Sequence, residues 1–365
     1  MRTEREWIIT DRKGGFAMGA IAGPRSRKYH GFYCSMPGRG EAGYLLDFEL
    51  EAFGKPLWPH RYTSPSGPVV QPEPAGFSFR ALPAGPSWSW KLEGGTLALR
   101  IESPAPGSIE IYVEWSSRKS EACPIRLRPL FGMRELHALG GQAWSWVERE
   151  GFEAAIRGAG REIYVRHSPE LKWKDEGCWY HGLWYSEELA RGYPAEEELF
   201  SGGYLAAAVP PGRMVSLRVS ERTDDLRSTR SRESGKRTGL LDFVLRDPAG
   251  IGAGYPWFGE WGRDTFVSLP GITLGWLHAG GDRAEVWDWA KAVLLRWGKW
   301  IETDGALPNL IERGGGPQWE SADATLWWCH SLAALWSASL SEPEGFLPIQ
   351  RACAPLLAHV LESIR

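Results

Sequence analysis

Short hydrophobic runs with alternating polar positions dominate the first 220 residues. In 108–115, Ile109, Ile111 and Val113 recur at every second position, which is the period of a β-strand with one buried face. Similar runs are separated by clusters of Gly, Pro and Ser, and they lie at 44–50, 96–102, 162–166 and 215–219. Several short strands divided by turns predict an antiparallel β-sandwich over 1–220.

A change of pattern follows this β region. Residues 221–237 read ERTDDLRSTRSRESGKR, which is dense in charge and nearly free of apolar side chains. We therefore predict a linker over 221–239, either as a loop or as an exposed connecting helix, and a second domain over 240–365.

The second domain has the period of helices. In 282–301, Ala290, Leu294 and Trp297 share one face, and Asp282 is placed to cap the helix. The run 324–340 is apolar nearly all round, which predicts a buried helix, and a further helix is expected over 347–364. Alternating amphipathic and buried helices suit a double-ring (α/α)6 barrel, although other helical bundles have the same pattern.

Composition narrows the classes of partner. The chain has 365 residues, 43% of them hydrophobic, and a formal net charge of −3 without a basic stripe, which argues against a nucleic-acid partner. It holds 21 tryptophans, an excess that suits stacking on sugar rings as well as core packing. No run is long enough to span a bilayer, so we expect no membrane partner.

The cysteines and the N-terminus bear on compartment. Five cysteines lie far apart, without the spacing of a zinc site or a disulfide framework, so we expect no metal and no cofactor. The first residues, MRTEREWIITDRKGG, lack the apolar segment of a secretory signal peptide. Together these features suit a reducing cytoplasm.

The most informative stretch is 255–270, which reads YPWFGEWGRDTFVSLP. Its aromatic residues, Trp257 and Trp261 among them, can form flat platforms for a sugar ring. Arg263 and Asp264 can form a fork that holds the hydroxyl groups of one sugar. Asp264 also precedes an apolar run, 265–274, so an N-cap role is the alternative interpretation.

A second block places an acid among aromatic residues. It reads WESADATLWW over 319–328, after Pro308 and Asn309 and a run of glycines. Asp323 could be a helix N-cap, but aromatic neighbours such as Trp327 exclude water and favour a protonated carboxyl group. A protonated carboxyl group is what a general acid for glycosidic cleavage requires. Glu320 is either a second acid near the site or an exposed loop residue.

Both blocks resemble the conserved blocks of the amylo-alpha-1,6-glucosidase (glycogen debranching) family. The first matches a YPWFG-[DE]-WGRD signature, and the second matches a Pro-Asn turn followed by an Asp-Ala-x-[LV]-W-[FW] helix start. The resemblance implies that Asp323 is the general acid and that Arg263 and Asp264 bind the terminal glucose. It implies substrate contacts for Trp257, Trp261, Asn309 and Trp327, with glycogen or a branched α-glucan as partner. The family usually has Tyr-Asn where this chain has Trp319-Glu320, which leaves substrate preference open.

The N-terminal region carries a third matching block. It reads EWIITDRKGGFAMGAIAGPRSRKYHGF over 6–32, and the family opens with a similar strand pair and an Arg-[KR]-Tyr-His-Gly turn. His30, within that turn, is either a turn-fixing residue or a contact to glycan at the rim of the site. A hydrogen-bonded structural role is favoured, because buried polar groups are normally paired.

One catalytic group is not found. The resemblance implies an inverting mechanism with a base carboxylate late in the catalytic domain, and no Glu of 240–365 has that context. Leu240 to Arg365 has room for about five helices, whereas six hairpins need about twelve. We therefore expect a truncated (α/α)6 barrel in a fragment that lacks the base, with the rest of the barrel as a partner.

Two other functions stay open at this point. One is a glucoamylase- or trehalase-like exo-glucosidase, which would prefer maltose or trehalose to isomaltose-type linkages. The other is a non-catalytic glycan-binding remnant, which would be retained by glycogen without releasing glucose.

Overall fold

The computed structural model describes residues 5–36, 41–72, 76–140, 146–227, 239–312, 316–319, 323–340 and 343–363. Its chain divides into two compact units. The first comprises Met1–Asp11, Gly15–Ser35 and Glu41–Ser231, and the second comprises Arg12–Gly14, Met36–Gly40 and Arg232–Arg365. The predicted linker lies partly outside the described residues, since 228–238 are not among them, but its start forms a short helix, α2 (Thr223–Arg227).

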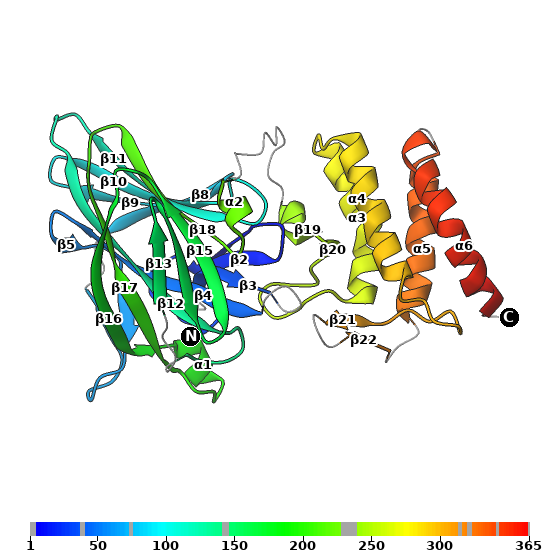
Figure 1. Ribbon diagram of the computed structural model, residues 1–365, viewed down its shortest axis with the longest axis horizontal. Coiled ribbons are helices and arrows are strands. Elements are labelled where there is room, and N and C mark those ends of the chain that lie inside the picture. Colours follow the sequence, from blue (N-terminus) through cyan, green and yellow to red (C-terminus); the bar gives the residue numbers. More distant parts are fainter. Residues whose placement is uncertain are drawn as a thin grey trace. The chain divides into compact units, whose positions relative to one another are not determined.

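The first unit is built on two antiparallel sheets (Figure 1). The larger sheet has the order β1-β2-β3-β4-β12-β17-β16-β6-β7, with β5 paired to β4. Its strands are β1 (Glu6–Thr10), β2 (Gly15–Ala20), β3 (Gly31–Ser35), β4 (Ala42–Ala52), β5 (Lys55–Pro56), β6 (His60–Tyr62), β7 (Val69–Gln71), β12 (Cys123–Glu135), β16 (Lys172–Trp184) and β17 (Glu196–Val209). Helix α1 (Ser186–Ala190) joins β16 to β17.

The smaller sheet has the order β13-β14-β15-β18-β11-β10-β9-β8. Its strands are β8 (Phe77–Leu82), β9 (Gly85–Leu92), β10 (Gly95–Glu102), β11 (Ile109–Ser117), β13 (Trp146–Glu150), β14 (Glu153–Gly158), β15 (Arg161–His167) and β18 (Arg213–Ser220). All five runs that the sequence predicts as strands are strands of one of these two sheets. The prediction of an antiparallel β region is therefore confirmed.

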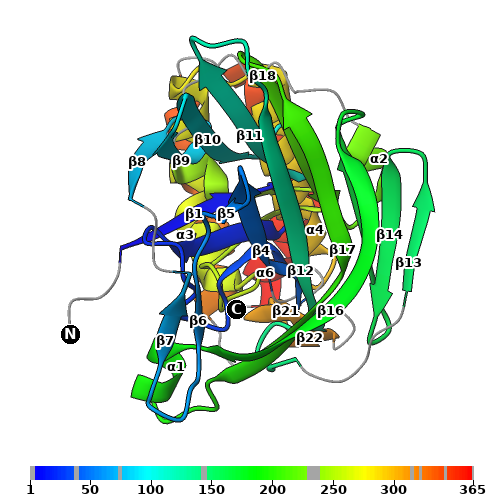
Figure 2. The same ribbon diagram turned by 90° about the vertical axis from the view of Figure 1, so that its left-hand side faces the viewer.

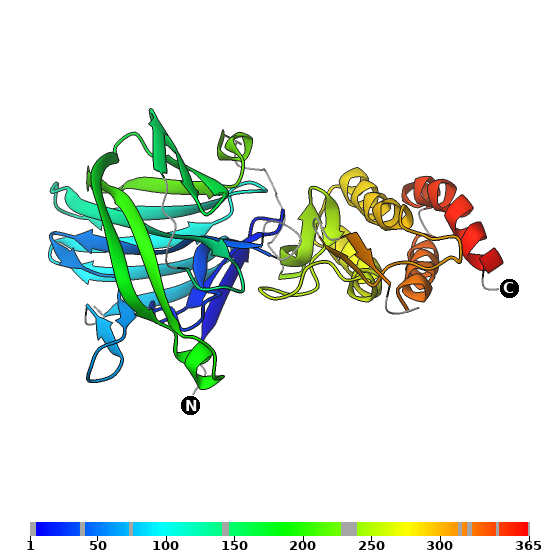
Figure 3. The ribbon, with the colours of Figure 1, turned by 60° about the horizontal axis from the view of Figure 1, so that its bottom comes forward.

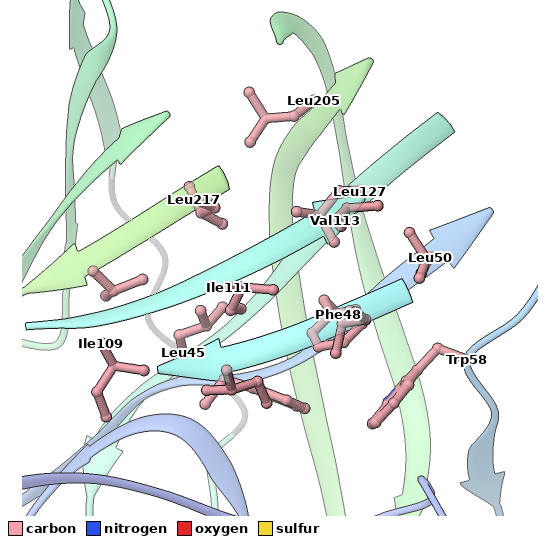
Figure 4. Close-up of a cluster of buried hydrophobic side chains, with 14 of the residues drawn as sticks. Leu45, Phe48, Leu50, Trp58, Ile109, Ile111, Val113, Leu127, Leu205 and Leu217 are labelled. Carbon is pink, nitrogen blue, oxygen red and sulfur yellow. The ribbon is translucent and has the colours of Figure 1, made fainter. Parts of the chain in front are cut away.

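The core of the first unit lies between the two sheets. Figure 4 shows Leu45, Phe48 and Leu127 of the larger sheet beside Ile109, Ile111 and Leu217 of the smaller one. Burial of these side chains on both inner faces is what holds the sandwich together, at roughly 25 cal/mol per Å² of apolar surface removed from water.

The second unit is helical, as predicted. It begins with η1 (Gly239–Phe243) and the hairpin of β19 (Val244–Arg246) and β20 (Ala249–Ile251), and a second hairpin joins β21 (Leu310–Glu312) to β22 (Gly316–Gln318). Its helices are α3 (Gly262–His278), α4 (Arg283–Gly298), α5 (Asp323–Ala338) and α6 (Leu347–Ser363), with η2 (Pro343–Gly345) before α6. Helix α3 packs on α5, α4 packs on α6, and α3 also packs on α4, so alternate helices are neighbours as well as consecutive ones (Figure 3).

Two details of the predicted helices can be compared with the structure. The Asp282 cap is confirmed, because its side chain accepts a hydrogen bond of 2.9 Å from the Glu285 backbone N–H. The prediction that 324–340 is buried nearly all round is wrong. Ala324, Trp328, Leu332 and Leu335 are buried, but Leu326, Trp336 and Leu340 are 60%, 55% and 67% exposed. No described helix is long and apolar enough to cross a membrane.

Candidate active site

Helix α3 begins inside the first motif rather than after it. Its first residue is Gly262, and the preceding Trp261 has an extended backbone and no capping side-chain hydrogen bond. Asp264 is therefore the third helical residue, and its interpretation as an N-cap is wrong. A carboxylate in the first turn still interacts favourably with the helix dipole.

The segment 307–310 is hydrogen-bonded to the starts of both α3 and α5. The Gly262 N–H donates to the Asn309 carbonyl oxygen at 2.8 Å, and the Leu307 N–H donates to Thr325 Oγ1 at 2.8 Å. A Cβ atom at Gly262 would lie 2.8 Å from the Pro308 oxygen and 2.9 Å from the Ala324 Cβ. The close approach of these backbones therefore depends on a glycine at the first position of α3.

This packing brings the two motif blocks into contact. Arg263 Nη1 lies 3.3 Å from Asp323 Oδ2, although the residues are 60 positions apart. The Arg263 side chain is 62% exposed and that of Asp323 is 33% exposed, so the pair is open to solvent. The motif predicts that Arg263 and Asp264 hold the hydroxyl groups of one sugar, and in the structure Arg263 contacts Asp323, the predicted acid.

Asp264 lines a cavity of about 500 Å³ within the second unit. The walls come from η1, the segment after β20, and one face of α3, and they consist of Gly239, Leu240, Phe243, Ile251, Gly252, Ala253, Asp264, Val267, Ser268, Gly271 and Ile272. Asp323 and Arg263 are not among the lining residues. The structure therefore brings Asp323 to Arg263 and separately places Asp264 at a cavity, and the two sites are linked through adjacent positions of α3.

Most of the predicted aromatic contacts remain accessible. Trp257 is 37% exposed, and Trp261 and Trp327 are half-buried. The Trp327 ring makes an edge-to-face contact with His330, at 5.3 Å between centroids. Asn309 is half-buried beside the start of α3. Glu320 lies outside the described residues.

Glu260 is a residue of the first motif that the sequence analysis did not single out. It is buried and forms an ion pair with Arg296 of α4. A Cβ atom at Gly250 would overlap the Glu260 carboxylate, so β20 leaves room for this pair. Its position inside a motif rich in site residues could have indicated that Glu260 is important. Nothing in the sequence identified Arg296 as its partner. Glu260 holds α4 against the loop that carries Trp257 and Trp261.

His30 belongs to the first unit and is fully buried. Its Nε2 lies 3.1 Å from Glu6 Oε1, and its Nδ1 lies 3.3 Å from the Ser26 backbone nitrogen. Burial lowers the pKa of His30. Burial alone would raise the pKa of Glu6, but hydrogen bonds from His30 and Arg27 bring it down to about 2. These contacts support the turn-fixing interpretation of His30 rather than a glycan contact.

Comparison with known families identifies the family to which the chain belongs. Residues 5–47 and 57–216 match the family model of the glycogen debranching enzyme N terminal, and residues 239–363 match that of amylo-alpha-1,6-glucosidase. The chain belongs to the glycogen debranching enzyme family. Both matched segments of this debranching-family chain agree with the resemblance seen in its motifs, and the second segment contains Arg263, Asp264 and Asp323.

Other comparisons are more distant. No curated protein matches the chain. Among solved structures, a putative kojibiose phosphorylase from the human microbiome has 9% identity and a TM-score of 0.44 over 83% of this chain and 46% of its own. The chain thus spans about half the length of that protein. A heparinase III has 9% identity and a TM-score of 0.29, over 60% of this chain and 34% of its own.

Proposed function

We propose that this chain takes part in glycogen debranching, by hydrolysis of α-1,6-linked glucose at branch points with inversion. The observation that carries the proposal is the contact between the two motif blocks, in which Arg263 at the start of α3 meets Asp323 at the start of α5. Membership of the debranching family supplies the substrate class.

Asp323 is the proposed general acid. The sugar oxygen that leaves is a poor leaving group unless it is protonated as the glycosidic bond breaks, and a carboxylic acid beside it can supply that proton. Asp323 is one-third exposed and begins a helix that carries Trp327. A substrate can therefore reach the carboxyl group, while Trp257, Trp261 and Trp327 provide stacking surfaces and Asn309 provides a polar contact.

Asp264 and Arg263 are the proposed ligands of the terminal glucose. The cavity at Asp264 has the volume of a small-ligand pocket, and its apolar walls carry few polar groups besides Asp264 and Ser268. Polar groups that are few and fixed on a helix set the orientation of a bound sugar. Arg263 would exchange its contact with Asp323 for sugar hydroxyl groups when the substrate binds.

The proposal assigns no residue of this chain to the role of base. An inverting mechanism needs a second carboxylate roughly 6.5–9.5 Å from the acid. The carboxylate of Glu260, inside the first motif, is already paired with Arg296 of α4. We infer that Glu260 does not activate water.

The proposed setting for the site is part of an (α/α)6 barrel. In a double ring, each helix neighbours the next but one, and the pairs α3–α5 and α4–α6 follow that rule. The two helices that carry site residues, α3 and α5, would then belong to the same ring, with their N-termini at the same end.

The test compares three disaccharides on the purified chain by titration calorimetry. Debranching predicts that isomaltose binds more tightly than maltose or trehalose. Tighter binding of maltose would favour a glucoamylase-like function, and tighter binding of trehalose a trehalase-like function. Equal binding of all three, or of none, would contradict the proposed substrate class.

A further inference from the structure

A cluster of aromatic and polar side chains lies on strands β16 and β17 of the first unit, which is not the unit that holds the candidate active site. Four side chains form it: Trp179 and His181 from β16, and Glu198 and Phe200 from β17. Figure 2 shows the two strands running side by side along the larger sheet.

The register of the two strands fixes the cluster. Trp179 lies directly opposite Phe200, and their rings meet edge to face at 5.3 Å. Trp179 and His181 are two residues apart, so their side chains point to the same face of the sheet. The His181 ring lies nearly parallel to the indole, at 24° and 6.4 Å. Glu198 is two residues before Phe200 on β17, so alternation along that strand puts it on this face as well.

The polar members are held in place but remain open to solvent. His181 Nδ1 lies 2.8 Å from Glu198 Oε1, and the two side chains are 66% and 43% exposed. An imidazole and a carboxylate arranged beside an indole offer hydrogen-bond donors and acceptors next to an apolar platform.

Gly177 lies beside the Phe200 ring of the cluster. It is exposed, and a Cβ atom built there would lie 3.4 Å from Phe200 Cζ. A longer side chain at this position would extend over the edge of the Phe200 ring, whereas glycine keeps that edge open.

We propose that Trp179, His181, Glu198 and Phe200 form a second glucan-binding site, on the unit that does not hold the candidate active site. The apolar face of a glucose unit stacks on the Trp179 indole, and its hydroxyl groups bond to His181 and Glu198. The identity of the ligand as an α-glucan rests on the proposed function. A site on the sheet unit would hold the polymer on the protein while chain ends are presented elsewhere.

The experiment is native gel electrophoresis of the full chain in gels that contain glycogen. We expect glycogen to retard the wild-type chain and Trp179→Ala to weaken that retardation about tenfold in apparent dissociation constant, the effect of one lost stacking contact. His181→Ala should also weaken it, and this exposed position tolerates substitution without loss of the fold. Phe152→Ala is the matched control, since Phe152 is an exposed aromatic residue of the same unit that also packs edge to face on a histidine, His167.

The gel experiment and the isomaltose titration together distinguish failure of the second site from failure of the proposed function. The second site would be overturned if glycogen retarded Trp179→Ala and His181→Ala as strongly as the wild type. It would also be overturned if Phe152→Ala lost as much retardation as Trp179→Ala, or if glycogen did not retard the wild type. Isomaltose titration reports on the proposed active site. Loss of isomaltose binding with Trp179-dependent retardation intact would contradict the proposed function and leave the second site supported.

Discussion

Asp323 is the side chain on which the proposed chemistry depends most. We predict that Asp323→Asn lowers the rate of glucose release by about 10²–10⁴-fold, because an amide cannot donate the proton that the leaving oxygen needs. Binding of the glucan should change little, since stacking and hydroxyl contacts are kept. The measurement is glucose release from a branched limit dextrin by a protein that contains this chain and is active on it. Ordinary turnover by Asp323→Asn would remove this residue from the acid role.

A second prediction at this scale concerns Glu6, whose pKa is held at about 2 by Arg27 and His30 in the folded state, against an ordinary value of 4.5. Ionised Glu6 therefore stabilises the fold above pH 4.5, and this contribution is lost as the pH falls from about 4.5 to 2. Its upper bound is about 3 kcal/mol, at roughly 1.4 kcal/mol per pKa unit.

Glu6→Gln removes that contribution. The melting temperature of the variant should be lower than that of the wild type at pH 7, and the difference should shrink as the pH falls towards 3. Thermal unfolding followed by circular dichroism at a series of pH values checks this. A difference that stays constant with pH would show that Glu6 does not titrate as described.

Individual residues were predictable where local chemistry decides them. Asp282 caps α4 because a short acidic side chain at that position bonds the free N–H groups of the first turn. The partner of Arg263 was not predictable, because the 60-residue separation from Asp323 is closed only by the packing of α3 on α5. Glu260 was missed for the same reason, since its partner Arg296 lies on another helix.

At the scale of elements, the contact between the start of α3 and segment 307–310 is the feature that positions the site. We predict that Gly262→Ala destabilises the second unit by roughly 1–3 kcal/mol, because the new methyl group must displace the Pro308 backbone or Ala324. It should also weaken isomaltose binding, since it separates Arg263 from Asp323.

Gly271→Ala is the matched control in the same helix for thermal stability alone, because Gly271 also lines the cavity at Asp264. Nothing lies within 4 Å of a Cβ atom at Gly271, and alanine favours a helix over glycine by up to about 1 kcal/mol. This variant should therefore be as stable as the wild type or more so. Equal thermal stability of the Gly262→Ala variant and the wild type would show that the close approach does not constrain the site.

The period of the hydrophobic residues predicted the helices and strands, but it did not predict the burial of every residue in them. The alternation in 108–115 predicted a strand with a buried face, and Ile109, Ile111 and Val113 are buried. The apolar character of 324–340 predicted a helix correctly and its burial incorrectly, because burial depends on neighbours that periodicity does not specify. In the described residues, Leu326 and Trp336 of α5 are not covered.

At the scale of the whole molecule, the question is whether this chain hydrolyses a glucan by itself. If no carboxylate of this chain acts as base, the purified chain should release little glucose from a branched limit dextrin, because water attack is then unassisted. A glucose-release assay over a range of chain concentrations measures this. Robust release would mean that a carboxylate within 1–365 acts as base, and Glu320, within the second block, would be the first candidate for substitution.

The measurement that tests the central claim most directly is isomaltose titration of three forms of the chain: wild type, Asp264→Ala and Asp323→Asn. If Asp264 lines the glucose-binding cavity and Asp323 serves as acid, Asp264→Ala should weaken binding at least about tenfold, the cost of one lost charge-assisted hydrogen bond. Asp323→Asn should bind within about threefold of the wild type, since its role lies in the transition state. Wild-type affinity in Asp264→Ala would contradict the assignment of the site.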